Sequence, residues 1–239
     1  MYQASPTEIT QFGAGKSPIL RVDIIADFTC PWCYIAKANL DQAIAKLHAP
    51  VEINWKPFHL FPETPGDNTK FTDFITDHIS KPIPAKKVIV DMIKLGKEAK
   101  LKFNFDKINT IPNTLDAHRI LAASNGSYKQ HKLAEDLFQA FFEHGRDISD
   151  RGVLLDIAVT AGMPLKSAKK TLNDSKTKKI TMAEIAEARS KGIDELPVII
   201  FNYRWMVTGL QDTDTYIQAI DAALFSENLD MDETQQVIH

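Results

Sequence analysis

The chain has 239 residues, of which 44% are hydrophobic and 25% are charged, and its net charge at pH 7 is −3. These values are ordinary for a globular protein and give no electrostatic reason to expect nucleic-acid or anionic-membrane binding. No apolar run approaches the ~18–20 residues that span a bilayer. Residues 1–17 lack the basic and apolar regions of a secretory signal. We therefore expect a cytoplasmic protein that binds neither nucleic acid nor membrane.

The first predicted elements form a β-α-β unit that follows a polar N-terminal arm, residues 1–17. Residues 19–28 are β-branched and apolar on both parities, which is typical of a strand covered on both faces. Helical periodicity then runs from residue 33 to 47, with a proline in the first turn, where its missing N–H is tolerated. Residues 51–55 alternate as a second strand. The usual handedness of such a crossover makes the two strands parallel neighbours.

From residue 71 to about residue 189 the periodicity is helical almost throughout. The helices expected there cover 114–124, 129–143, 151–161, 167–172 and 181–190. Strands return at 198–201 and 204–208, with Asn202-Tyr203 as a hairpin turn, and a last helix covers 212–225. We therefore expect one domain built from residues 18–66 and 192–225, an all-helical insertion domain at 67–191, and a polar, acidic tail at 226–239.

The chain contains only two cysteines, Cys30 and Cys33, in the sequence Cys-Pro-Trp-Cys between the first strand and its helix. A thiolate is the nucleophile in disulfide exchange, and a helix N-terminus favours the charged form of a nearby thiol. Cys30 would lie at that end with its sulfur exposed, and Cys33 one turn further, shielded behind it. Position therefore predicts that Cys30 attacks and that Cys33 resolves the mixed disulfide.

Two other interpretations of the pair compete with redox chemistry. A zinc half-site needs two more Cys or His ligands. No cysteine remains, and the seven histidines contain no pair at zinc-finger spacing, so no metal is expected. An inert pair is the second alternative, because free cysteine is often buried. The position between a strand and a helix favours the redox interpretation.

The order of elements resembles that of the DsbA-like oxidoreductases, and more narrowly their FrnE branch. That branch is related to 2-hydroxychromene-2-carboxylate isomerases and kappa-class glutathione transferases. The segments that carry the resemblance are Asp27–Lys37, Trp55–Leu60, Pro112–Arg119, Gly145–Ser149, and Leu196–Val198 leading to Gly209–Gln211. The resemblance implies an α/β thioredoxin-like fold (βαβ–ββα) with a long all-helical insertion.

The resemblance also implies several site residues. Pro197 is expected to be cis beside the disulfide, with Leu196 offering backbone groups to a bound thiol. In this family the insertion covers the site, so Asn113 and Arg119 become candidate substrate contacts. From the residues alone, the favoured interpretation of Asn113 is a helix N-cap, with Asp116 at N3 as a loose capping box. The dipeptide between the cysteines, Pro31-Trp32, is expected to present an exposed indole ring to the substrate.

The predicted activity is thiol–disulfide exchange, with no cofactor other than a thiol such as glutathione. Its partner would be a thiol- or disulfide-containing protein or a small thiol, and both a monomer and a homodimer remain open. One alternative is a glutathione-dependent isomerase or transferase acting on a small aromatic substrate. Those relatives typically carry serine in place of Cys30, so two sulfurs favour the oxidoreductase. A non-enzymatic thiol-binding module is the third hypothesis.

One departure from the better-known relatives concerns a buried acid. Thioredoxin carries it six residues before the first active cysteine, where this chain has Ile24. Asp23 and Asp27 lie on the opposite parity of the predicted strand. We therefore interpret Asp27 first as a turn residue at the end of the strand. A role for it in proton relay stays open.

Overall fold

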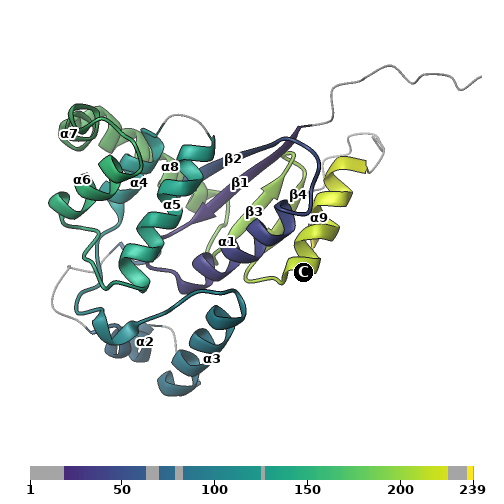
Figure 1. Cartoon of the computed structure of the whole chain (residues 1–239), viewed down its shortest axis with the longest axis horizontal. Helices are drawn as coiled ribbons and strands as arrows, with labels where there is room; N and C mark the ends of the chain where they lie inside the picture. Colours follow the sequence, from purple (N-terminus) through teal and green to yellow (C-terminus); the bar gives the residue numbers. More distant parts are fainter. Residues whose placement is uncertain (1–18, 63–69, 79–82, 125–126, 226–235, 239) are drawn as a thin grey trace, which may run out of the picture.

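A mixed β-sheet with the strand order β2-β1-β3-β4-β5 lies at the centre of the protein (Figure 1). The computed structural model describes residues 19–62, 70–78, 83–124, 127–225 and 236–238. The strands of the sheet are β1 (Leu20–Ala26), β2 (Val51–Pro57), β3 (Val198–Phe201), β4 (Trp205–Thr208) and β5 (Gln236–Ile238). The first four agree with the strands that the sequence predicted, to within three residues at each end.

The pairing of the strands follows from their connections. β1 and β2 run parallel with Leu20 opposite Val51, as the predicted β-α-β unit requires. β3 pairs antiparallel with β1, and β4 with β3. Residues 202–204 join β3 to β4, one residue more than the predicted turn, and Phe201 pairs with Trp205. Asn202 and Tyr203 have the left-handed φ angles of 48° and 59°, and the N–H of Arg204 donates to the carbonyl of Phe201 (3.0 Å). The side chain of Asn202 donates to the carbonyl of Ala223 (2.8 Å), which holds the turn against the last helix.

The strand β5 was not predicted. We expected residues 226–239 to form a tail, but Gln236–Ile238 pairs parallel with β4. Three residues are too few for a periodicity signal, so no sequence pattern indicated this pairing. Residues 226–235 and the N-terminal arm, residues 1–17, lie outside the described residues.

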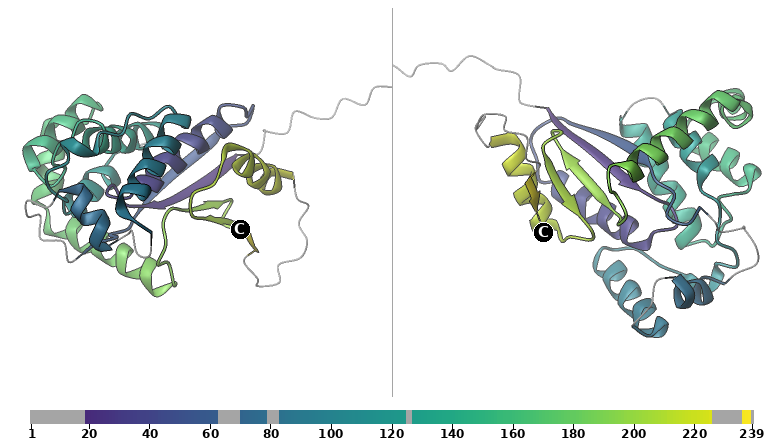
Figure 2. Two further views of the ribbon diagram at one scale, coloured as in Figure 1. Left: turned by 90° about the horizontal axis from the view of Figure 1, so that it is seen from below. Right: turned by 180° about the vertical axis from the view of Figure 1, so that it is seen from behind.

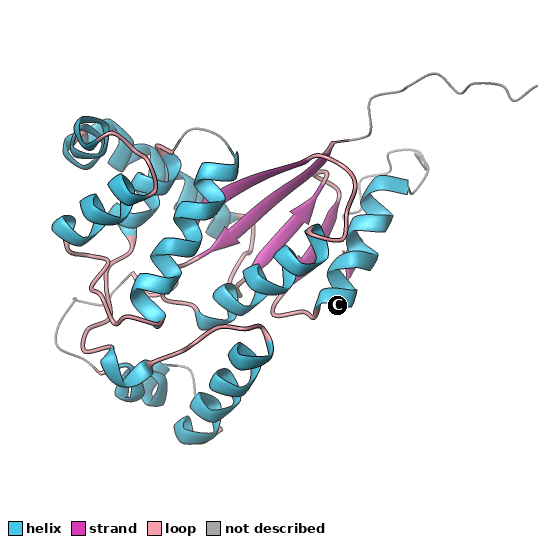
Figure 3. Ribbon diagram, viewed as in Figure 1, coloured by secondary structure: helices cyan, strands magenta, loops and turns pink. Residues whose placement is uncertain are grey.

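Helices cover both faces of the sheet near the start of α1 (Figure 3). α1 (Pro31–Ile44) and α9 (Thr213–Phe225) lie side by side on one face. α8 (Ser175–Ser190) approaches the opposite face, which Figure 2 shows from behind, and its residues line a cavity together with Asp23 and Ile25 of β1. β1 is therefore covered on both sides, as its apolar pattern predicted.

The chain between β2 and β3 is helical. Its elements are α2 (Phe71–His78), α3 (Ala85–Glu98), the 3-10 turn η1 (Phe105–Lys107), α4 (Leu115–Ala122), α5 (Ser127–Phe142), α6 (Arg151–Thr160), α7 (Leu165–Asn173) and α8. α8 begins six residues earlier than expected, because Asp174 caps it by accepting from the N–H of Lys176 (2.8 Å). No helix among the described residues is long and apolar enough to cross a membrane.

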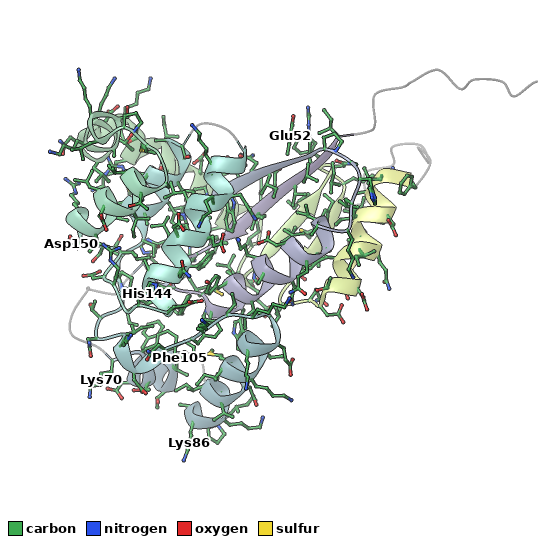
Figure 4. All side chains as sticks on the ribbon, viewed as in Figure 1. Glu52, Lys70, Lys86, Phe105, His144 and Asp150 are labelled. Atoms are coloured by element: carbon green, nitrogen blue, oxygen red, sulfur yellow. The ribbon has the colours of Figure 1, made fainter. Side chains whose placement is uncertain are left out.

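The insertion and the sheet share one hydrophobic core. Its buried residues form a continuous cluster that reaches from the strands into the inserted helices. Phe105, labelled in Figure 4, stacks on Phe71 with ring centroids 4.6 Å apart. Phe103 continues the ring cluster to Tyr34 of α1, whose ring it meets edge-on at 5.8 Å. The inserted helices therefore support the helix that carries the two cysteines.

Candidate functional site: the Cys30–Cys33 pair

Cys30 and Cys33 lie at the N-terminal end of α1, just after β1. Cys30 is the N-cap residue, with an extended backbone (φ −91°, ψ 108°), and Pro31 begins the helix. The N–H of Cys33 donates to the carbonyl of Cys30 (3.1 Å), and both thiols are free. The first turn of α1 carries no acidic residue. The positive end of the helix dipole therefore faces the sulfurs with no carboxylate of that turn opposing it.

A cavity of about 640 Å³ opens beside Cys30. Its walls come from the start of α1, the segment after β2, and the loops that flank the β3–β4 hairpin. The lining residues are Cys30, Pro31, Trp32, Leu60, Phe61, Asp194, Glu195, Leu196, Gly209 and Leu210. We expected Cys30 to be exposed, and this was wrong, since only 2% of the residue is accessible. The segment after β2 and the loop before β3 line the cavity together with Cys30. A partner sulfur therefore has to enter the cavity to reach the Cys30 sulfur.

Cys33 lies deeper than Cys30. It is 2% exposed and is absent from the cavity wall, which agrees with the shielded position predicted for it. Burial raises the pKa of the Cys33 thiol well above its usual value, and the neighbouring Cys30 sulfur and Asp27 carboxylate raise it further. Cys33 therefore stays protonated at neutral pH until a reaction removes its proton.

Leu196, just before β3, also lines the cavity, and Pro197 follows it. The peptide bond between them is cis, and Leu196 lines the cavity together with Cys30. The carbonyl of Pro197 accepts from the N–H of Gly209 (2.8 Å), which ties the start of β3 to the end of β4. The structure thus places Leu196 in the same cavity wall as Cys30, while Pro197 is not among the lining residues. The role of both residues in binding a thiol stays a prediction.

Pro31 and Trp32 also line the cavity, so all residues of the Cys-Pro-Trp-Cys sequence except Cys33 reach it. Trp32 is half-buried and packs against the core, which corrects the expectation of an exposed ring. Trp32 is therefore part of the cavity wall, and its contact with a substrate stays a prediction.

Asn113 and Arg119 lie away from the cavity wall. Asn113 is exposed, and its Oδ1 accepts from the N–H of Leu115 (3.1 Å) at the start of α4. Arg119 is buried and directs its guanidinium to Asp116 and to the carbonyl of Thr171 (2.6 Å). These contacts give both residues structural partners within the insertion, and their role in substrate binding stays a prediction.

Asp27 is completely buried beneath the pair. β1 ends at Ala26, so Asp27 belongs to the turn that leads into α1, and strand parity does not decide its direction. Its Oδ1 accepts from the N–H of Thr29 (3.2 Å), and its Oδ2 accepts from the N–H of Leu60. The N–H of Cys30 donates to the Asp27 carbonyl (3.1 Å). Asp27 thus accepts hydrogen bonds from the turn that carries Cys30 and from the segment after β2 that lines the cavity.

Two histidines lie near Asp27, and the sequence analysis did not single out either. Nε2 of His118, from α4, is 3.9 Å from Oδ1 of Asp27. Burial lowers the pKa of His118 to about 4, although the Asp27 carboxylate opposes this effect. Burial likewise lowers the pKa of His59, again against the Asp27 carboxylate. Nε2 of each histidine is buried and has no hydrogen-bond partner among the described residues.

A signal for these histidines was present in the sequence. His59 and His118 fall inside two of the segments that resemble the FrnE branch, Trp55–Leu60 and Pro112–Arg119. Nothing in the sequence showed that both segments meet at Asp27. Within the part of the chain that the structure describes, no three His, Cys, Asp or Glu side chains come together as a metal site.

Several known proteins are similar to this chain in sequence or in fold. A curated relative, the uncharacterized protein YwbO of Bacillus subtilis, is 23% identical over 204 residues, covering 84% of this chain and 96% of its own. The structure is similar to that of a probable DsbA oxidoreductase, SCO1869, from Streptomyces coelicolor. That match has a TM-score of 0.76 and 22% identity, and covers 90% of this chain and 94% of the other.

The cytosolic disulfide reductase DsbM from Pseudomonas aeruginosa, solved with GSH, is also similar in fold. Its TM-score is 0.58 at 16% identity, with 87% of this chain and 98% of the other covered. The model of the DSBA-like thioredoxin domain matches residues 21–221, which include both cysteines and all of the cavity wall. The chain therefore belongs to the family of proteins with a DsbA-like thioredoxin domain.

Proposed function

We propose that this protein is a thiol–disulfide oxidoreductase in which Cys30 forms the mixed disulfide and Cys33 resolves it. The observation that carries this proposal is the difference between the two sulfurs. Cys30 caps a helix and lines a cavity, whereas Cys33 is buried one turn behind it with a raised pKa. Cys30 can therefore meet a partner sulfur in the cavity, whereas Cys33 can react only with the Cys30 sulfur.

In the reductive direction, the Cys30 thiolate attacks one sulfur of a substrate disulfide. A bond forms between Cys30 and that sulfur, and the other substrate sulfur leaves as a thiolate with the electron pair. Cys33 then loses its proton and attacks the Cys30 sulfur, which releases the second substrate thiolate and closes the Cys30–Cys33 bridge. The substrate gains two electrons and the protein loses two. The oxidative direction is the same sequence reversed.

The partner is a thiol or disulfide small enough to enter the cavity, such as glutathione or an extended segment of a protein. The similarity in fold to a cytosolic disulfide reductase solved with GSH supports glutathione as a candidate and a cytoplasmic setting. No further cofactor is needed, because the sulfurs themselves carry the electrons.

An insulin-reduction assay and a dithiol-oxidation assay test the proposal. The wild type should turn over in at least one of them, and Cys30→Ser should be inactive. Cys33→Ser should lose turnover and accumulate a mixed disulfide on Cys30. A wild type no better than Cys30→Ser would overturn the proposal. Full glutathione-dependent activity on a small aromatic substrate in Cys33→Ser would favour a transferase or isomerase instead.

A further inference from the structure

Two cavities of the protein meet at the loop before β3. The first is the cavity beside Cys30 described above, called here the Cys30 cavity. The second, called the back cavity, has a volume of about 470 Å³ and lies between the end of α8 and the sheet, on the side that Figure 2 shows from behind. Asp194 and Glu195 line both cavities. An extended chain that enters the Cys30 cavity can therefore cross this loop and continue into the back cavity.

The floor of the back cavity is apolar. Its side chains come from four neighbouring strands of the sheet: Ile25, Pro57, Val198, Ile200 and Met206. Ile200 and Met206 pair across β3 and β4 and are only half-buried. Covering such side chains with another apolar group removes more apolar surface from water and is favourable. The floor therefore suits the apolar residues of a polypeptide.

The rim of the back cavity is acidic. Its charged residues are five carboxylates and two lysines: Asp23, Glu184, Glu187, Asp194 and Glu195, with Lys56 and Lys191. Lys191 pairs with Glu187 at 2.6 Å, and Lys56 also attracts Glu187, so both cations act on one carboxylate. Within the part of the chain that the structure describes, Glu184, Asp194 and Glu195 form no ion pair. The rim thus carries an excess of negative charge.

The Cys30 cavity has the same sign. Among the described residues that line it, only Asp194 and Glu195 are charged, and both are exposed. Charges that line a cleft attract a substrate of opposite sign and repel one of like sign. Oxidised glutathione carries about −2 at pH 7, whereas a disulfide beside lysine or arginine is positive. The wall therefore favours the cationic disulfide.

We propose, on the basis of the oxidoreductase function above, that the partner is a cysteine-containing polypeptide segment with basic and apolar residues near its cysteine. Asp194 and Glu195 select for it. The sulfur of the segment enters the Cys30 cavity, a lysine or arginine meets the two loop carboxylates, and an apolar side chain covers the floor of the back cavity. The exchange chemistry is unchanged. Of the two kinds of partner named above, the protein segment is therefore preferred over glutathione.

Two small disulfides of opposite charge test this selection. Cystamine carries about +2 and oxidised glutathione about −2 at pH 7. Attack of the reduced protein on each is measured as a second-order rate constant by acid quenching and intact mass. Asp194→Asn combined with Glu195→Gln should lower the ratio of the cystamine to the glutathione rate constant about 10-fold at low salt, since each exposed charge pair is worth a factor of a few. The ratio cancels any change in the Cys30 nucleophile or in the folded fraction.

The chain offers a matched control for net charge. Glu98→Gln combined with Asp221→Asn removes two charges from exposed positions of α3 and α9. The ratio should then stay within about 2-fold of the wild type. Raising the salt concentration from about 20 to about 500 mM shortens the Debye length from roughly 20 to roughly 4 Å. The wild-type ratio should fall toward that of the Asp194 and Glu195 double variant.

A peptide disulfide tests the back cavity separately. The probe is the symmetric disulfide of a heptapeptide in which arginine and leucine flank a central cysteine. Glu184 lines the back cavity and not the Cys30 cavity, so Glu184→Lys should lower the ratio of the peptide to the cystamine rate constant about 5-fold. Glu98→Lys, the same charge reversal on α3, should leave this ratio within about 2-fold. Serine in place of the peptide's leucines should slow the wild type about 10-fold.

Each outcome has a distinct meaning. A cystamine-to-glutathione ratio that is equal in the wild type and the Asp194 and Glu195 double variant would overturn the inference, as would equal rates for the peptide and for its counterpart with glutamate in place of arginine. A peptide rate that responds neither to Glu184→Lys nor to loss of the leucines would overturn the polypeptide partner. If the wild type attacks none of these disulfides, or Cys30→Ser reacts as fast, the proposed function fails instead.

Discussion

Tyr34 follows Cys33 directly, and its ring stacks on that of Phe138 in α5 with centroids 5.2 Å apart and planes inclined by 10°. Its hydroxyl donates to Glu143 at the end of the same helix (3.0 Å). The helix that carries the cysteines is therefore anchored to the insertion through the residue next to Cys33. Packing at this contact joins the start of α1, with both cysteines, to a helix about 100 residues further along the chain.

We expect Tyr34→Ala to lower the free energy of unfolding by about 3–5 kcal/mol, because it removes a buried aromatic ring. Tyr34→Phe keeps the ring and loses only the hydrogen bond, so it should cost about 1 kcal/mol. Glu143 then still accepts from the N–H of Lys102 (3.2 Å). Urea denaturation measures both values, and equal losses in the two variants would show that ring stacking contributes little.

The buried imidazole of His118 predicts acid sensitivity. Its pKa of about 4 in the folded protein is below the value of roughly 6.5 in an unfolded chain. Between pH 6.5 and pH 4 the unfolded chain therefore binds more protons than the folded protein. The free energy of unfolding decreases as the pH is lowered through that window. The full loss is of order 3 kcal/mol, and His59 adds to it in the same direction.

Urea denaturation at pH values from 4 to 7.5 checks this prediction. His118→Phe should flatten the pH dependence, because the group that titrates on unfolding has been removed. His48→Gln, at an exposed histidine, serves as the control for loss of an imidazole. A wild-type stability that stays constant from pH 6.5 to pH 4 would contradict the assignment.

Arg119 provides a test between a structural and a substrate-binding role. Its guanidinium joins α4 to the carbonyls of Thr171 and Asp174 and to the hydroxyl of Thr177. Arg119→Met should lower the free energy of unfolding by about 3 kcal/mol, since it removes the buried charged donor that these groups share. Asp116 then keeps only Arg151, and the two carbonyls keep only the hydroxyl of Thr177. Cys30 reactivity in the folded variant should be unchanged. A stable variant with an increased KM for the disulfide would instead support substrate contact.

The enclosed position of Cys30 predicts selectivity by size. A small alkylating reagent should modify it readily, and a bulky one should be hindered more strongly than at a free cysteine. Phe61 lines the cavity, so Phe61→Ala should reduce this discrimination. Phe225→Ala removes a ring of the same size that is 71% exposed at the end of α9, and should have no effect. Equal hindrance in the wild type and Phe61→Ala would show that this wall does not control access.

The sequence predicted the thioredoxin-like elements well because each has a strong local signal. The alternation from Val51 to Trp55, the hairpin at Asn202-Tyr203 and the cysteine pair before α1 were all recognised within a few residues. These features depend on neighbours in the chain. The same is true of Cys33, whose shielded position follows from one turn of helix.

The surroundings of the pair were harder to predict because they depend on contacts between distant segments. Cys30 shares its cavity wall with Leu60 and Leu196, which are 30 and 166 residues away. Asp27 is a turn residue at the end of β1, as the sequence predicted, but its complete burial depends on segments far away in the chain. His118 reaches Asp27 from 91 residues further along the chain, and no pattern in the sequence joins them.

The most direct test of the central claim is a titration of the reduced protein in glutathione redox buffers, read by intact mass. We predict that the wild type loses two hydrogens in a single transition, with a midpoint within the range of about −270 to −120 mV that this class of dithiols covers. Cys33→Ser should instead take up one glutathione. A wild type that keeps both thiols at every glutathione ratio, or that carries glutathione on Cys30 without closing the bridge to Cys33, would contradict the account.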